Sequence, residues 1–141
     1  MMDEVKLQRY QLITETGRHV ELEYDQDGDM LEIFFQKGPA TSAIELADPM
    51  ILRFDREAGV AVSLSILTFS KVIEQTELGP RNFQLYGLDA LPDTLRQMVS
   101  KIITSPPVNT FLKVSTYYPK TEQSPVILSY LAQSVALPVA A

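Results

Sequence analysis

Three aspartates around one glycine, Asp25, Asp27 and Asp29 beside Gly28, are the most prominent residues for chemistry in this chain. Oxygen-rich loops bind calcium, and an EF-hand loop also begins with alternating acids. Here, however, the glycine is the fourth residue of the loop and not the sixth, and Gln36 occupies the position of the bidentate glutamate. A hairpin turn explains the same residues, since Asp and Gly tolerate left-handed backbone. We therefore expect a turn and no metal ion.

Nucleophiles and bases are the next candidates. His19 is the single histidine, and a general base needs a positioned partner, which no nearby triad motif supplies. Ser63, Ser65, Thr68 and Ser70 form a row of hydroxyls without a Gly-x-Ser-x-Gly elbow. Alternation places Ser63 and Ser65 on a solvent face, as plain surface or a mild, uncharged contact surface. We predict no catalytic residue.

Composition removes several classes of function. The chain has no cysteine, which excludes disulfides, thiol nucleophiles and cysteine-based metal sites. Its six glycines are isolated, and none introduces a Gly-Lys-Ser/Thr sequence, so we expect no phosphate loop and no cofactor. Twelve basic residues face 18 acidic ones, for a net charge of −6. This balance argues against nucleic-acid partners and anionic membrane surfaces.

The length of 141 residues predicts a single domain over 1–141. The first ten residues lack the apolar core of a signal peptide. Residues 123–141 carry no ionisable side chain, but Pro125 and Pro138 interrupt them, and no run approaches the roughly 20 apolar residues that span a bilayer. We therefore expect a cytoplasmic protein.

Alternating apolar residues predict the sheet that would position these groups. Residues 19–36 have this pattern on both sides of the Asp-Gly turn, which indicates a β-hairpin. Further strands are predicted at 40–46, 50–54 and 60–69, the last with Val60, Val62, Leu64 and Ile66 on one face. These segments form a β-meander core over about 19–72. Residues 1–16 fit either a short helix or an irregular strand.

One amphipathic helix is predicted to cover the sheet. Its apolar stripe has helical spacing and consists of Leu91, Leu95, Met98, Val99, Ile102 and Ile103. Pro92 lies in the predicted first turn, and prolines 106 and 107 end the helix, which gives a range of about 91–104. The predicted fold class is α+β: an antiparallel meander of five or more strands with one main helix packed on one face.

The C-terminal strand segments, about 110–131, are the leading candidates for contact with a partner. Residues 110–118 read as a strand, and 125–131 as a strand or a short helix. Charge falls away after Glu122, and aromatic, uncharged segments are typical of interface centres as well as of buried cores. Both interpretations stay open. The predicted contact residues are Phe111, Tyr117, Tyr118 and Tyr130.

Residues 20–72 resemble the domain of unknown function 2283. The resemblance lies in Tyr24-Asp25 before the turn, in residues 29–33 after it, and in the two strands at 51–55 and 59–62. It implies a hairpin-rich architecture and no catalytic residues. The helix at 91–104 and residues 106–112 resemble a cyanobacterial extension of this domain. Among such proteins are carboxysome shell-assembly chaperones, and the resemblance implies binding of a peptide tail.

We therefore expect a non-catalytic protein-binding module, in its finer form an assembly chaperone that captures a segment of a larger partner such as a carboxysome shell protein. Open sheet edges suit this role, because they accept an added strand. One alternative is a small carboxylate-dependent hydrolase or isomerase that uses Asp25, Asp27 and Asp29. A structural homodimer is another, so the expected state is monomer or homodimer.

Overall fold

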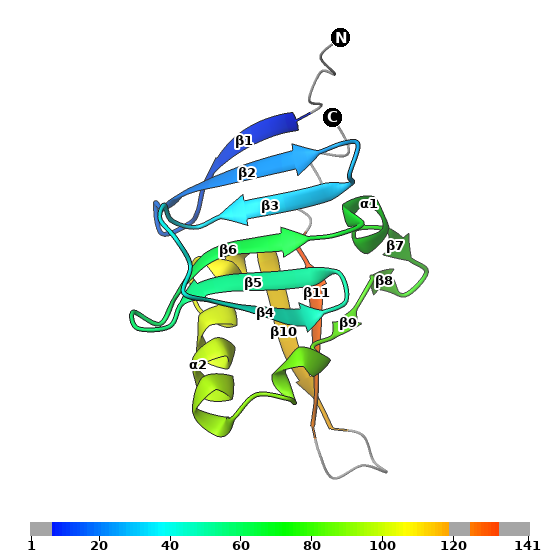
Figure 1. The fold of residues 1–141 in the computed structure, drawn as a ribbon. Helices are drawn as coiled ribbons and strands as arrows, with labels where there is room; N and C mark the ends of the chain where they lie inside the picture. Colours follow the sequence, from blue (N-terminus) through cyan, green and yellow to red (C-terminus); the bar gives the residue numbers. More distant parts are fainter. Residues whose placement is uncertain (1–6, 119–124, 133–141) are drawn as a thin grey trace.

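The computed structural model describes residues 7–118 and 125–132. In this part of the chain a large antiparallel sheet lies in front of an α-helix and a small sheet, and the hydrophobic core fills the space between them (Figure 1). The predicted α+β class is thus confirmed.

Six strands form the large sheet, and all neighbouring strands are antiparallel. They are β1 (Leu7–Ile13), β2 (His19–Asp25), β3 (Met30–Phe34), β4 (Ser42–Ala47), β5 (Met50–Asp55) and β6 (Val60–Ile66). The order is β1-β2-β3-β6-β5-β4, so two three-stranded meanders join where β3 pairs with β6. Within the ambiguous segment 1–16, Leu7–Ile13 forms an edge strand, and residues 1–6 lie outside the described residues.

The alternating residues of these strands place one apolar row across the sheet. Leu22 pairs with Ile33, Ile33 with Leu64, and Leu64 with Leu52, and all four side chains are at most 2% exposed. Burying a side chain of this size contributes about 1.5–3 kcal/mol. A shift of one residue in any strand would turn its apolar residues outward, so this row also specifies the register.

The predicted face of β6 is wrong at Val60 and Val62, because Ala61 belongs to the core whereas Val62 lines a cavity together with Ser63. Arg53 pairs with Ser63 but Phe54 pairs with Ala61, so the register shifts between these pairs, as in a β-bulge. Ala61 therefore belongs to the core beside Phe54, whereas Val60 is 37% exposed. The strand also ends at Ile66 and not at residue 69.

A chain of short elements connects β6 to the main helix. They are α1 (Phe69–Val72), β7 (Gln75–Thr76), β8 (Gly79–Pro80), β9 (Phe83–Gln84) and the 3-10 helix η1 (Tyr86–Leu88). The backbone of η1 lies directly against β4, because a Cβ atom at Gly87 would come within 1.8 Å of the Glu45 carbonyl oxygen. Glycine is required at this contact.

The main helix, α2 (Asp93–Ile103), confirms the predicted helix within two residues at each end. Pro92 is its N-cap residue and does not lie in the first turn. Val99, Ile102 and Ile103 are buried in the core. Arg96 fastens the helix to the preceding segment, because its guanidinium donates to the carbonyl oxygens of Leu88 and Leu91.

The small sheet has three strands in the order β10-β11-β9. β10 (Leu112–Tyr117) follows the short helix α3 (Val108–Phe111), and β11 (Val126–Leu131) pairs with β10 and β9. The predicted strand at 110–118 is confirmed from Leu112 onward, and 125–131 contains a strand. None of the helices described is long and apolar enough to cross a membrane.

Candidate functional site

The loop of three aspartates is a hairpin turn. Asp25 Oδ1 accepts hydrogen bonds from the backbone N–H groups of Asp27 and Gly28, at 3.1 and 3.2 Å. These are bonds of an Asx turn, as the turn interpretation predicts. Residues 7–118 and 125–132 contain no group of three or more His, Asp or Glu side chains that could hold a metal ion.

Asp29 joins the hairpin to α1. Its carboxylate accepts hydrogen bonds from Ser70 Oγ at 2.6 Å, from Ser70 N–H at 3.0 Å, and from the Tyr24 hydroxyl at 2.8 Å. Burial raises the pKa of Asp29, but the hydrogen bonds from Ser70 and Tyr24 and the positive charge of Lys71 outweigh it and lower the pKa below its ordinary value. The carboxylate is therefore held ionised by structural contacts.

The contact between Tyr24 and Asp29 shifts the pKa of the tyrosine in the opposite direction, upward. Burial, the hydrogen bond to Asp29 and the charges of Asp29 and Asp25 raise the pKa of Tyr24 to about 12. Asp25 and Asp29 are thus committed to the turn and to α1, and no two of the three aspartates converge on a shared cavity. This geometry gives no support to the carboxylate hydrolase alternative.

His19 and the two serines lie on the outer face of the large sheet, the face that points away from α2 and the small sheet. His19 is exposed at the start of β2. Ser63 and Ser65 point to this face as predicted, yet they are only 2% and 3% exposed. Arg53, which sequence reasoning missed, donates from Nη1 to Ser65 Oγ at 2.6 Å. Its place opposite the serines follows only from the strand register.

Phe111, one of the four predicted contact residues, belongs to the core. It ends α3 and is 0% exposed, and its ring lies 6.0 Å from that of Phe35, centroid to centroid. The sequence predicts a strand here, whereas a helical turn directs this side chain inward. A side chain with no exposed surface cannot contact a partner in this conformation, so we remove Phe111 from the candidates.

The strand register brings two of the other candidates to one surface. Tyr117 pairs with Val126, Ser115 with Leu128, and Lys113 with Tyr130. Because side chains alternate along a strand, all six point to the same side. We call this surface the tyrosine face, and it consists of Gln84, Lys113, Ser115, Tyr117, Val126, Leu128 and Tyr130.

The opposite side of the small sheet packs against the core. Leu112 and Leu131 are buried there, and Val114 and Ile127 pack against the same cluster. The tyrosine face is therefore the outer side of the sheet, held flat by a core on its inner side. In Figure 1, β10 and β11 lie behind the large sheet.

The tyrosine face is amphipathic and carries little charge. Tyr117 is 55% exposed, whereas Val126, Leu128 and Tyr130 are partly exposed. The one charged side chain on it is Lys113, whose Nζ donates to the Asn109 carbonyl oxygen at 2.8 Å. Tyr118 directly follows β10 and is 72% exposed. Exposed aromatic area with few charges is characteristic of interface centres.

Comparison with known proteins identifies part of the chain. Residues 21–70 match the model of a family described as "Protein of unknown function (DUF2283)". No curated protein and no solved structure matches the chain. The matched residues run from β2 to the second residue of α1, whereas every residue of the tyrosine face lies outside them. The chain therefore contains a region of the DUF2283 type at residues 21–70, joined to a C-terminal part that carries the tyrosine face.

Proposed function

We propose that this protein is a non-catalytic protein-binding module that contacts its partner through the tyrosine face. The observation that carries the proposal is the position of Tyr117 and Tyr130. They lie on one face, in the two outer pairs of three adjoining cross-strand pairs, with Ser115 and Leu128 as the central pair and Lys113 as the single charge. Such a surface offers aromatic anchors with an uncharged centre.

The rigidity of this surface favours binding. Tyrosine presents a large contact area and loses few rotamers on binding, and its hydroxyl still finds a polar partner at the rim. The strands that carry Tyr117 and Tyr130 are also fixed by a buried inner side, so little backbone order has to be gained when a partner docks.

The chemistry of the face indicates the kind of partner. A surface with one lysine and no carboxylate does not select a strongly charged ligand, so the partner segment is apolar or uncharged. β10 is also an edge strand in the order of the small sheet, which suits an added extended segment. Capture of a peptide segment of a larger assembly, as carboxysome shell-assembly chaperones do, is the finer form of this proposal.

The experiment uses a double variant, Tyr117→Ser with Tyr130→Ser, and a matched control. The control is Tyr86→Ser, since Tyr86 is 42% exposed but lies in η1, outside the tyrosine face. Each tagged protein is used for quantitative affinity capture from the native cell. We expect one or more proteins that the wild type and the control recover equally and the double variant loses.

Retention of every captured protein by the double variant would overturn the proposal. Light scattering on the purified chain distinguishes a homodimer from binding to a different protein. A mass of twice 15.8 kDa that returns to 15.8 kDa in the double variant would assign the face to a second copy of this chain instead of another protein.

A further inference from the structure

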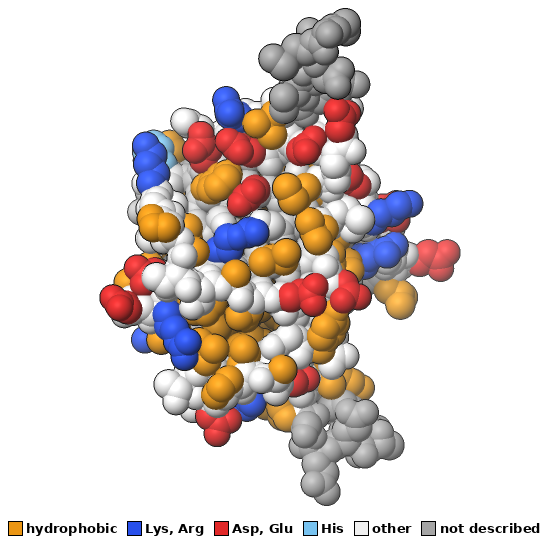
Figure 2. Space-filling model, in the orientation of Figure 1, with side chains coloured by type: hydrophobic (Ala, Val, Ile, Leu, Met, Phe, Trp, Pro, Cys, Tyr) orange, Lys and Arg blue, Asp and Glu red, His pale blue; other side chains and the backbone are white. Residues whose placement is uncertain are grey.

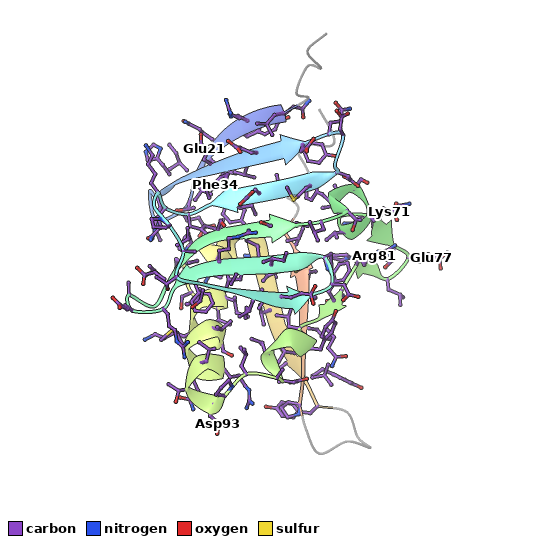
Figure 3. All side chains as sticks on the ribbon, viewed as in Figure 1. Glu21, Phe34, Lys71, Glu77, Arg81 and Asp93 are labelled. Atoms are coloured by element: carbon purple, nitrogen blue, oxygen red, sulfur yellow. The ribbon has the colours of Figure 1, made fainter. Side chains whose placement is uncertain are left out.

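A hollow lies on the outer face of the large sheet, far from the tyrosine face. One register row crosses four neighbouring strands there: Glu21 pairs with Phe34, Phe34 with Ser63, and Ser63 with Arg53. Figure 3 shows Glu21 and Phe34 on adjacent strands of this face. The small serine between two long side chains leaves a cavity of about 540 Å³, which His19 and other residues also line.

Arg53 leans away from this cavity floor. Its Nη1 donates to Ser65 Oγ at 2.6 Å and forms an ion pair with Glu32 Oε2 at 3.7 Å, so the guanidinium is bound to Ser65 and Glu32 and not to Ser63. Ser63 is 2% exposed and lines the cavity, and its hydroxyl makes no hydrogen bond to any other described residue. Because none of the described residues has a buried side-chain polar atom without a hydrogen-bond partner, the Ser63 hydroxyl is reached by solvent at the cavity floor, where an oxygen atom of a ligand can accept a hydrogen bond from it.

Most N–H groups of the Arg53 guanidinium have no hydrogen-bond acceptor among the residues described. The guanidinium makes one hydrogen bond, to Ser65, among the residues described, although it has five N–H donors in a fixed fork. Its side chain is 40% exposed. A carboxylate placed beside this fork would receive two parallel charge-assisted hydrogen bonds, whereas Glu32 forms an ion pair with it at 3.7 Å without a hydrogen bond.

Around these two polar groups the cavity wall is mixed. Phe34 and Val62 supply apolar surface, and Lys37 adds a positive charge from the segment after β3. Glu21 and Glu32 line the same cavity and offset the charges of Arg53 and Lys37, so the cavity has no net positive charge to hold more than one carboxylate. Figure 2 looks onto this face, where hydrophobic side chains are interspersed with acidic and basic ones. The volume is within the range for small ligands.

We propose that the hollow binds a small monocarboxylate with an apolar body. The carboxylate lies between the Arg53 guanidinium and the Ser63 hydroxyl, and the apolar body packs on Phe34 and Val62. This site is independent of the proposed protein-binding surface, and all four residues lie within the part of the chain that matches the family model.

The test is a titration followed by ¹H–¹⁵N correlation spectra, with 3-phenylpropionate as the probe and its neutral amide as the matched control. We expect saturable shifts of the amides of Phe34, Arg53 and Ser63, and binding of the amide at least about tenfold weaker, since it lacks the charge that Arg53 pairs with. The absence of saturable shifts at about 10 mM probe, or equal binding of the amide, would overturn the proposal.

Two variants assign the contacts. Arg53→Gln weakens binding at least about tenfold, and Ser63→Ala about three- to tenfold, as loss of one hydrogen bond does. Arg9→Gln is the control, because Arg9 lies on the same outer face in an ion pair with Glu23, at 3.1 Å, but not at the cavity. It leaves binding unchanged. If the Arg53→Gln variant does not fold, the Ser63→Ala variant tests the proposal by itself. An unchanged affinity of this variant for 3-phenylpropionate would overturn the proposal.

Discussion

The two sheets share one core but differ on their outer faces. On the large sheet, polar side chains pair with one another, as Arg9 does with Glu23 and Arg53 with Ser65. On the small sheet, the tyrosine face places Tyr117 and Tyr130 around apolar residues, with Lys113 as its single charge. The outer face of the large sheet is thus built from polar side chains that contact one another, whereas the outer face of the small sheet presents partly exposed apolar and aromatic side chains.

This difference separates two kinds of recognition. A polar sheet face with one unfilled position suits a small ligand, because a few groups decide its orientation. A flat aromatic face suits a macromolecule, because contact area and anchors supply its affinity. The family-matched residues 21–70 carry the first surface, and the C-terminal part carries the second.

The largest expected effect distinguishes a core residue at the end of α3 from a residue on the outer face of the small sheet. Phe111→Ala lowers the free energy of unfolding by about 3–5 kcal/mol, since it removes a fully buried ring. Tyr117→Ala, on the tyrosine face, changes it by less than about 0.5 kcal/mol. Urea denaturation followed by circular dichroism measures both. Equal losses of unfolding free energy in the two variants would contradict the assignment of Phe111 to the core and of Tyr117 to the outer face.

Gly87→Ala tests how closely η1 docks on the large sheet. A Cβ atom would lie 1.8 Å from the Glu45 carbonyl oxygen, so the backbone must shift, and the free energy of unfolding falls by about 1–3 kcal/mol. Hydrogen exchange at the amides of β4 reports the local change. Unchanged protection there together with unchanged stability would show that this contact is not formed.

Asp29→Asn tests the link between the hairpin and α1. Asparagine keeps the left-handed backbone that Asp29 adopts, at φ 50°, but loses the charge, so stability at pH 7 falls by about 1–3 kcal/mol. Because the folded pKa of Asp29 is lowered, its contribution is full above the unfolded pKa and is lost as pH falls through the folded one. The difference between the proteins should shrink below about pH 4. A difference that is independent of pH would contradict this assignment.

Tyr24→Phe tests the partner of Asp29, with a smaller effect of about 1 kcal/mol at pH 7. The pKa of Tyr24 is raised from 10.0 to about 12, so its stabilising effect is full below pH 10 and is lost as pH rises toward 12. Between about pH 10 and pH 12, the free energy of unfolding of the Tyr24→Phe variant should therefore fall less than that of the wild type. Thermal unfolding at stepped pH values measures it, and parallel curves would argue against the hydrogen bond to Asp29.

Periodicity predicts the local elements of this fold well. The hairpin around Gly28 and the helix with Val99 and Ile102 follow from alternating and helical spacing, since each depends on neighbours close in sequence. Strand order does not follow in this way. The β3–β6 pair and the bulge near Ala61 depend on contacts between distant segments, which one sequence does not encode in a local pattern.

The candidate surfaces are predicted only in part. Of the four predicted contact residues, Tyr117 and Tyr118 are exposed and Tyr130 is partly exposed, but Phe111 shares their composition and lies in the core. Composition alone does not separate the two, because buried and contact residues look alike. The hollow at Ser63 was missed for a related reason, since its opposite walls come from strands that pair only in the folded sheet.

Site-specific photo-crosslinking tests the central claim most directly. A benzophenone amino acid replaces Tyr117, Tyr130 or, as the control, Tyr86 in η1, and cells that express each protein are irradiated. The proposal that the tyrosine face binds a protein predicts adducts to the same partner protein from positions 117 and 130 and none from position 86. Equal adducts from all three positions, or adducts from position 86 alone, would contradict it.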